Sequence, residues 1–550
     1  MASRPPGPET SKSVDDYDAR LAEQCEKREL EMTFREALCN DKRLIWYSLG
    51  FSGTIIMEGY GLALITYLFS FPEFKQKFGE LDPQTGQHEL RYMWRVLLPL
   101  VAQFGSIIGI LIASPITKHF GYKRTVLMML VFSAAFVNLS FLAQSVPILL
   151  AGFLLQGIPW GVFQVLSPGY SSEIASVQLR PILTTWNNLC WVIGQLLASG
   201  IVKGFEQYQS EYSFRIPFAL QWVFSVLLII AVSFAPESPY WYLHWKHVER
   251  ARAAIKKMVR KGSPERTEEK LALMRHTIHQ ENRKDEDITQ GAWKRLCAMV
   301  QGTDRRRTEI SCIAWLIQSL CGSSIIPWAP KLFESAGLLP SQALSINIAL
   351  PAAGILGTLG SWWLMRKWGR RQIYFWGLVV MGILLAGCGF AAFASSSVAG
   401  WAAGAILIVY TAIYDLTIGP VCYSIVSEIP SIRRRTSTLS AARGTYLVAG
   451  LVNHFLTPKM LGSDAESWGV GPKTGFLYAG MCALGAMYTW FRIPETNGLS
   501  TRELDVLFQN KVKAKNFSID KAAQLDALEN KNLSGISHNS VHGSRSSEKV

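Results

Sequence analysis

Long apolar segments recur along this chain and constrain its fold more than any other feature. A helix needs about 20 mostly apolar residues to cross a bilayer with all its backbone hydrogen bonds closed. Twelve such segments occur, at about 44–71, 94–116, 125–144, 146–168, 183–203, 215–235, 309–331, 343–365, 372–394, 401–427, 437–461 and 472–492. The sequence therefore predicts an all-α integral membrane protein of twelve transmembrane helices.

Polar stretches divide the chain into five parts. We expect an N-terminal tail (1–43), a six-helix half (44–235), a linker (236–308), a second six-helix half (309–492) and a C-terminal tail (493–550). Apolar residues of the linker recur at helical spacing and predict short amphipathic helices lying against the bundle, namely Val248, Ala251, Ala254, Ile255 and Met258. From about residue 511 the composition is typical of a disordered tail.

Charge is distributed unevenly. The chain has 55 Lys and Arg against 41 Asp and Glu, and basic residues gather in the loops after the second, eighth and tenth segments. Such loops stay on the cytoplasmic side, and the first 40 residues contain no apolar core of a secretory signal. We therefore expect both termini to be cytoplasmic, with the lipid bilayer and not nucleic acid as the partner of the basic residues.

Residue patterns that carry enzyme chemistry are not found in the sequence. The nine cysteines are scattered singly, the histidines have no zinc-site spacing, and no phosphate-binding loop or activated nucleophile is recognisable. We expect no enzymatic activity, no cofactor and no bound metal.

Three features recur in register between the two halves. Gly121 corresponds to Gly369, 248 residues later, and the sequence Pro-Glu-Ser at 236–238 corresponds to Pro-Glu-Thr at 494–496. Glu173 and Arg180, seven residues apart, correspond to Glu428 and Arg435, also seven apart. The repeat predicts two parallel six-helix halves, an architecture that holds one solute site at the membrane midplane and rocks around it.

The repeated charges fall at cytoplasmic ends of helices. We predict that they form salt bridges that latch the halves together and part as the halves tilt, through Arg124, Glu173, Arg180, Glu237, Arg371, Glu428, Arg435 and Glu495. The alternative is that these charges only anchor helix ends among lipid headgroups.

Two acidic residues lie inside apolar segments, Glu58 in the first and Asp415 in the tenth. An ionisable side chain at membrane depth costs at least about 2.5–3.5 kcal/mol, so each invites a functional explanation. Either residue could carry a proton or bind a hydroxyl group. Alternatively, Glu58 is a neutral acid bonded to a backbone carbonyl, or Asp415 lies near the outer surface.

Amides and aromatic rings at membrane depth suit a polyhydroxylated solute. Gln195 and Gln318 offer both donors and acceptors, and Trp191 could stack on a sugar ring. Tyr423 follows a helix break expected at Gly419-Pro420, and broken helices line cavities. Asn188 is a further binding candidate, with bridging between helices as its alternative role.

At these residues the chain resembles the sugar porter branch of the major facilitator superfamily. The matching pieces are Pro236-Glu237-Ser238-Pro239, Gly369-Arg370-Arg371, Gln318 with Gly322, Gly419-Pro420 through Ser427-Glu428, and Pro494-Glu495-Thr496-Asn497-Gly498. Within that branch, 57–60, 188–195 and 419–423 look most similar to fungal maltose and α-glucoside permeases. The resemblance implies a proton symporter of the plasma membrane that imports glucosides or short oligosaccharides.

Two positions depart from the pattern of those permeases. Gly61 and Ser106 stand where the resemblance leads us to expect acidic residues, and neither side chain can exchange a proton at physiological pH. Three hypotheses follow: a sugar transporter that is uncoupled or coupled through Glu58 or Asp415, a membrane sugar sensor without effective transport, or a transporter of another small metabolite.

Overall fold

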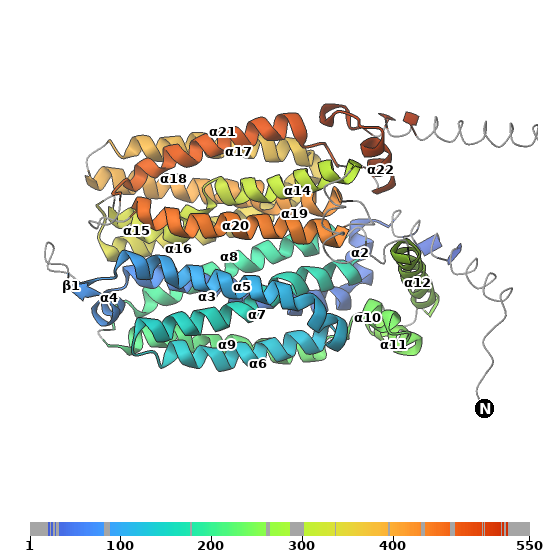
Figure 1. The fold of residues 1–550 in the computed structure, drawn as a ribbon, viewed down its shortest axis with the longest axis horizontal. Helices are drawn as coiled ribbons and strands as arrows, with labels where there is room; N and C mark the ends of the chain where they lie inside the picture. Colours follow the sequence, from blue (N-terminus) through green and yellow to red (C-terminus); the bar gives the residue numbers. More distant parts are fainter. Residues whose placement is uncertain are drawn as a thin grey trace, which may run out of the picture.

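Long helices running along a common axis make up nearly all of the described chain in the computed structural model (Figure 1). The structure describes residues 20–21, 24–25, 28 and 32–525, with gaps at 82–87, 177–178, 209, 260–263, 287–301, 336, 394–395, 431–434, 462–467, 498, 500, 519 and 522–523.

The first half of the bundle contains six long helices. They are α3 (Lys42–Tyr67), α5 (Tyr92–Phe120), α6 (Tyr122–Phe141), α7 (Val146–Ile174), α8 (Arg180–Phe205) and α9 (Tyr212–Phe234). At the end of α3 follow η1 (Leu68–Ser70), α4 (Pro72–Phe78) and a two-stranded antiparallel ribbon, β1 (Glu80–Leu81) with β2 (His88–Glu89).

The second half repeats this arrangement with two interrupted helices. Its elements are α14 (Gly302–Leu320), η2 (Ser323–Trp328), α15 (Ala329–Ser335), α16 (Pro340–Lys367), α17 (Arg370–Ala391), α18 (Ser396–Leu416), α19 (Ile418–Glu428), α20 (Arg435–Leu461), η4 (Gly471–Lys473) and α21 (Thr474–Arg492). Ten helical segments of the described chain are long and apolar enough to span a membrane. Helices α20 and α21 lie among them in the same bundle (Figure 1). The predicted all-helical membrane architecture is confirmed.

Proline and glycine place the two helix interruptions. Helix α18 ends at Leu416 because the ring of Pro420 crowds the carbonyl four residues earlier, so the break lies at Thr417, slightly before the Gly419-Pro420 position expected from sequence. Helix α14 ends before Gly322, whose φ of 101° is left-handed. A break frees backbone carbonyls from helical bonding, and beside Gly322 the carbonyl of Gln318 accepts from the Ser323 hydroxyl at 2.8 Å and that of Cys321 from the Tyr410 hydroxyl at 2.9 Å.

Glycines bring α5 and α7 into backbone contact. A Cβ added to Gly105 would lie 2.1 Å from the carbonyl oxygen of Leu154, and one added to Gly157 would lie 2.2 Å from that of Ala102. Both clashes occur again one turn later. Small residues four apart permit this close packing in a bilayer, where apolar side chains gain little from mutual contact.

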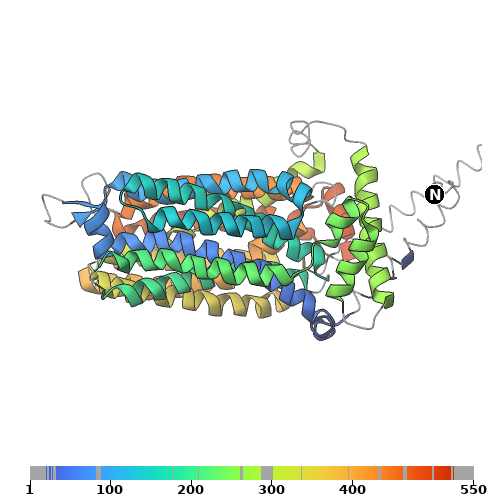
Figure 2. The same cartoon turned by 90° about the horizontal axis from the view of Figure 1, so that it is seen from below.

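Short helices gather at one end of the bundle, opposite the β1–β2 ribbon (Figures 1 and 2). They are α2 (Phe34–Asn40), α10 (Pro239–His244), α11 (Val248–Met258), α12 (Pro264–Glu286) and α22 (Thr501–Gln509), with the one-turn η5 (Ala514–Asn516) following α22. The linker helices share a small apolar core that includes Leu243, Ile255 and Leu271. Both Trp241 and Trp245 donate their indole N–H to the carbonyl of Lys118, at 2.9 and 3.1 Å, which fixes the linker to the end of α5.

Candidate functional site

A chain of polar side chains crosses from one half to the other at Glu58. This carboxyl is completely buried on α3, and its Oε1 accepts a hydrogen bond from Nε2 of Gln164 on α7. The Oε1 atom of Gln164 in turn accepts from the guanidinium of Arg443 on α20, at 2.7 Å. One amide therefore links an acid of the first half to a base of the second.

Aromatic rings surround the guanidinium of Arg443. Its Cζ lies 4.8 Å from the ring centre of Trp315 and 4.7 Å from that of Tyr446. The Tyr423 ring meets the Trp315 ring edge to face at 4.9 Å. Cation–π contacts hold the guanidinium in place, and the same rings offer flat apolar faces beside charged and amide groups.

Gln318, one of the predicted binding residues, lies on α14 just before the helix interruption. Nε2 of Gln318 donates to the hydroxyl of Tyr414 at 3.2 Å. Among the described residues no donor reaches its Oε1, although that atom is buried. A buried acceptor without a partner is costly unless a ligand or water satisfies it, so Gln318 has the character of a binding group.

The remaining predicted binding residues lie on α8. Gln195 is buried, and Trp191 is partly buried against the core. Helix α8 approaches α3 closely at this level, since a Cβ on Gly59 would lie 2.5 Å from the carbonyl oxygen of Trp191. These residues are thereby held near Glu58 through their backbone.

Asp415 forms a second polar contact between the halves. Only 3% of this residue is exposed, and its Oδ1 accepts from Nδ2 of Asn188 on α8 at 2.9 Å. Gly354 on α16 makes room for the carboxyl, because a Cβ there would lie 2.5 Å from Oδ2. Asp415 is therefore buried between α8 and α16, where the two halves meet.

Gln164 and Arg443 did not figure among the sequence-predicted site residues. Arg443 is a charged residue inside the eleventh apolar segment, so the rule that selected Glu58 and Asp415 also applies to it. Gln164 carries no comparable signal, because amides occur in several apolar segments. Glu58 therefore accepts a hydrogen bond from a side-chain amide, and this takes the place of the backbone carbonyl named in the alternative prediction.

At the end that carries the linker helices, two carboxylates cap the starts of helices in matching positions of the two halves. Glu237 accepts from the backbone N–H of Tyr122 at 2.7 Å, and Glu495 accepts from that of Arg370 at 2.8 Å. Negative charge is favoured at a helix N-terminus, where backbone donors and the helix dipole converge. Burial raises the pKa of Glu237 above its ordinary value, although these backbone donors oppose the shift.

The other repeated acids also occupy equivalent positions. Glu173 accepts from the hydroxyls of Tyr122 and Ser238, and Glu428 accepts from the hydroxyl of Thr496. The arginine paired with Glu428 is Arg370, at 3.4 Å.

Two of the predicted arginines reach the expected acids, but not through a salt bridge between side chains. Arg371 donates its side chain to the Trp490 carbonyl at 2.7 Å and its backbone N–H to Glu495. Arg124 acts on Glu237 through its charge. The side chains of Arg180 and Arg435 lie outside the described part of the chain.

We expect Gly369→Ala to lower the stability of the protein by about 1–2 kcal/mol, the usual cost of losing a helix cap. The added Cβ would lie 2.0 Å from Oε2 of Glu495 and displace that carboxylate from the start of α17. Thermal unfolding of the detergent-solubilised protein measures the change. The matched control is Gly480→Ala on α21, where a Cβ meets nothing within 4 Å. Equal unfolding temperatures for the two variants would contradict the capping role.

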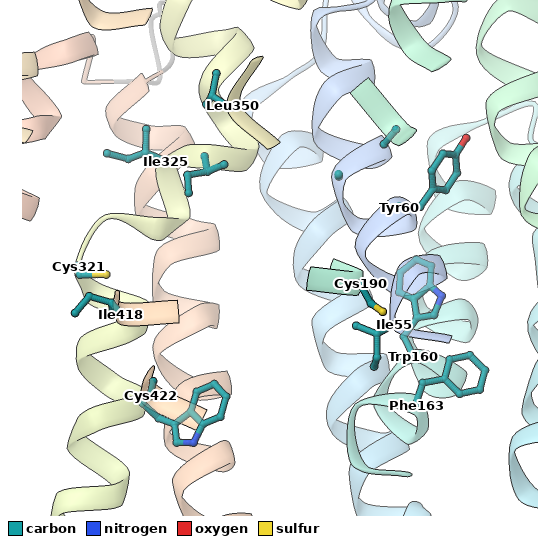
Figure 3. Close-up of a cluster of buried hydrophobic side chains, with 14 of the residues drawn as sticks. Ile55, Tyr60, Trp160, Phe163, Cys190, Cys321, Ile325, Leu350, Ile418 and Cys422 are labelled. Atoms are coloured by element: carbon teal, nitrogen blue, oxygen red, sulfur yellow. The ribbon is translucent and has the colours of Figure 1, made fainter. Parts of the chain in front are cut away.

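Trp160 occupies the space beside Gly61. A Cβ at position 61 would lie 2.3 Å from Cζ2 of this indole, which is completely buried. Figure 3 shows Trp160 in the core of the first half, separate from a group in the second half that includes Cys321, Ile418 and Cys422. At the other departure from the permease pattern, the single O–H of Ser106 is shared between two backbone carbonyls, those of Ala102 at 3.1 Å and Gly157 at 3.3 Å.

Comparison with known proteins identifies the family. The sequence profile described as "Sugar (and other) transporter" matches residues 49–508. The chain belongs to this family. Its members are transporters, and in this chain a polar network joins the two halves.

Relatives and solved structures agree with this assignment. The chain is 34% identical to the maltose permease MAL31 of Saccharomyces cerevisiae over 505 residues, 91% of this chain and 81% of the relative. It is 33% identical to the alpha-glucosides permease MPH3 of the same organism over 525 residues, 95% and 86% of the two chains. Its fold matches the proton:xylose symporter XylE, a major facilitator superfamily protein, bound to 6-bromo-6-deoxy-D-glucose, with a TM-score of 0.69 at 22% identity, covering 85% of this chain and 100% of the other.

Proposed function

We propose that this transporter imports maltose or a related α-glucoside across the plasma membrane together with protons, and that Glu58 binds the proton. Its similarity to a maltose permease and an alpha-glucosides permease supports the substrate class. The observation that carries the coupling proposal is the hydrogen-bonded path from Glu58 through Gln164 to Arg443, because it joins an acid and a base of opposite halves.

The path suggests how one proton changes the contact between the halves. While Glu58 is ionised, its charge and that of Arg443 balance each other through the amide of Gln164. Protonation of Glu58 removes the charge that Gln164 and Arg443 stabilise, and the link between α7 and α20 weakens. Proton binding then favours separation of the halves at this level, which is the differential effect that coupling requires.

The neighbouring side chains support recognition of a sugar ring. Oε1 of Gln318 can accept from a hydroxyl, and the faces of Trp315 and Tyr423 can stack on the apolar side of a pyranose. Gln195 and Trp191 on α8 complete the proposed binding set from the first half. Asn188 holds Asp415 in this conformation, so we place it at the edge of the set.

The basic loops support the proposed orientation. Lys118 bonds to Trp241 and Trp245 of the linker, and Arg124 lies near Glu237 at the start of the linker. Figure 1 shows this bundle end with α2, the linker helices and α22. We assign this end to the cytoplasm by the rule that basic loops stay inside, so the described termini lie in the cytoplasm as well. The β1–β2 ribbon then faces outward.

Uptake of radiolabelled maltose into transporter-deficient yeast cells tests the proposal. We expect saturable uptake by cells that express this chain and loss of accumulation when a protonophore is added. Vector-only cells and a set of unlabelled α-glucosides as competitors serve as controls. Uptake that the protonophore does not affect would contradict coupling. No uptake of any α-glucoside at confirmed surface expression would contradict the substrate class and favour a sensor or a transporter of another metabolite.

A further inference from the structure

A cluster of five charged residues joins the two halves at the end of the bundle that carries β1 and β2. Lys75 on α4, Glu89 on β2 and Arg95 on α5 come from the first half, and Lys331 and Glu334 on α15 come from the second. Neither the sugar-binding set nor the proton path uses them. Sequence patterns did not select these residues, because most of them lie in short connections between the long helices.

Glu89 is the centre of the cluster. Its carboxylate lies 2.9 Å from Nζ of Lys75, 3.4 Å from Nζ of Lys331 and 4.0 Å from the guanidinium of Arg95. A second carboxylate, Glu334, lies 3.4 Å from Lys331 and 3.7 Å from Lys75. Two of these ion pairs, Lys331 with Glu89 and Lys75 with Glu334, cross between the halves.

The cluster is shielded from water. Side-chain exposure is 2% for Arg95, 7% for Lys331, 11% for Glu334, 12% for Lys75 and 22% for Glu89. Charges at this depth are screened less than surface pairs, and several of them share partners, so the cluster can contribute more than an isolated exposed salt bridge. Removing one partner leaves the others incompletely compensated.

Other contacts between the halves lie at the same end of the bundle as the cluster. The ring of Phe69 on η1 lies 5.5 Å from the ring of Trp328 on η2, and both are buried. The Tyr92 hydroxyl on α5 donates to the carbonyl of Phe455 on α20 at 3.2 Å. The bundle is therefore closed at this end by apolar and charged contacts together.

We propose that the Glu89-centred cluster is the outer gate of the transporter, a set of ion pairs that must separate each time the solute site opens to the outside. An alternating-access protein opens one end by moving its halves apart, and every bond across that end opposes the movement. The strength of the cluster then sets the equilibrium between outward-closed and outward-open forms. This inference rests on the family's alternating access and on the proposed orientation, and does not depend on which sugar is carried.

The gate stays charged in mildly acidic surroundings. Burial would raise the pKa of Glu89, but Lys331, Lys75 and Arg95 outweigh burial and hold it below the ordinary value of 4.5. Glu89 therefore keeps its charge as the pH falls towards that value, and its ion pairs weaken as it becomes protonated below it. External protons that drive symport do not open this gate by neutralising Glu89.

Labelling of a buried cysteine from outside measures how often the gate opens. The reporter is Asn347→Cys, because Asn347 is 1% exposed and lies two turns inside α16 from its start at Pro340. A membrane-impermeant maleimide is applied to intact cells that express the full chain. We expect Glu89→Gln in this background to raise the labelling rate about ten-fold, the effect of losing roughly 1.4 kcal/mol of closing interactions. Lys331→Gln is expected to act in the same direction.

The matched control is the exposed ion pair of Arg91 with Glu80, whose side chains are 65% and 58% exposed. Arg91→Gln removes a charge from the same connection without touching the cluster and should leave labelling unchanged. The Glu89→Gln, Lys331→Gln double variant should exceed neither single variant by much, because each single variant already removes the Lys331–Glu89 pair, which is the ion pair that these two residues make across the halves.

Unchanged labelling in Glu89→Gln at equal surface expression would overturn the proposal that the cluster is the outer gate. If the effects of Glu89→Gln and Lys331→Gln on labelling add fully in the double variant, the claim that the two residues act through one shared ion pair is wrong. Should Glu89→Gln fail to reach the surface, Glu334→Gln, which breaks the pair with Lys75 across the halves, gives the same test. Labelling needs no sugar and no proton gradient, so it separates failure of the gate from failure of the proposed transport activity.

Discussion

Replacing Glu58 with Gln is expected to abolish accumulation of the sugar against its gradient while the protein stays folded. The amide matches the carboxyl in size and can still accept from Gln164, but it cannot bind and release a proton. A membrane potential of 100 mV is worth about 2.3 kcal/mol per charge, so losing one coupled proton lowers the accumulation ratio about 40-fold. The ratio of internal to external labelled maltose at steady state measures the effect.

Asp415→Asn is the control for this experiment. The introduced side-chain amide can still accept from Asn188 and fills the space beside Gly354, so a coupling path through Glu58 leaves accumulation intact in this variant. The reverse pattern, with accumulation lost in Asp415→Asn and kept in Glu58→Gln, would mean that Asp415 and not Glu58 binds the coupled proton. Normal accumulation in both variants at matched surface expression would contradict coupling through either acid.

The twelve helical segments and their division into halves could be predicted because bilayer thickness dictates the length of an apolar run. Helix ends were predicted less well. Helix α7 continues to Ile174, six residues past the predicted end at 168, and α5 continues to Phe120, four past 116. Hydropathy marks where the hydrocarbon ends, whereas backbone hydrogen bonding and neighbouring helices decide where a helix stops.

The cost of burying charge indicated Glu58 and Asp415, and the structure links both to the opposite half, Glu58 through Gln164 and Asp415 directly. Their partners could not be predicted in the same way. Gln164 follows Glu58 by 106 residues, and Asn188 precedes Asp415 by 227. No local periodicity relates residues at such separations, because the pairing depends on how two halves dock and not on any one helix.

The internal repeat predicted which acids are equivalent, but not what they bind. Glu237 and Glu495 were expected to form salt bridges with arginines, whereas both accept from the backbone at helix starts. The expected partner of Glu428 was Arg435, whose side chain lies outside the described part of the chain, and the structure pairs Glu428 with Arg370. Neighbouring residues in a helix point about 100° apart, and sequence alone did not reveal which arginine faces the acid.

Introducing an acid at position 61 is expected to destabilise the protein and not to restore a lost coupling site. In Gly61→Asp the new Cβ would lie 2.3 Å from Cζ2 and 2.6 Å from Cη2 of the buried Trp160. Overpacking typically costs about 1–3 kcal/mol, and an uncompensated buried charge costs about 3–5 kcal/mol more. These costs approach the whole stability of an ordinary domain, about 5–15 kcal/mol. Surface expression and thermal unfolding in detergent measure the loss.

Two further variants separate steric exclusion from an effect of the charge. Gly200→Ala on α8, where a Cβ meets nothing within 4 Å, should be as stable as the original chain. The Gly61→Asp, Trp160→Ala double variant removes the indole and should recover part of the expression that Gly61→Asp alone loses. Normal stability of Gly61→Asp would contradict the steric argument. Recovery only in the double variant would show that Trp160 fills the volume a carboxylate would need, so that any proton coupling in this chain must use acids elsewhere, with Glu58 the nearest on α3.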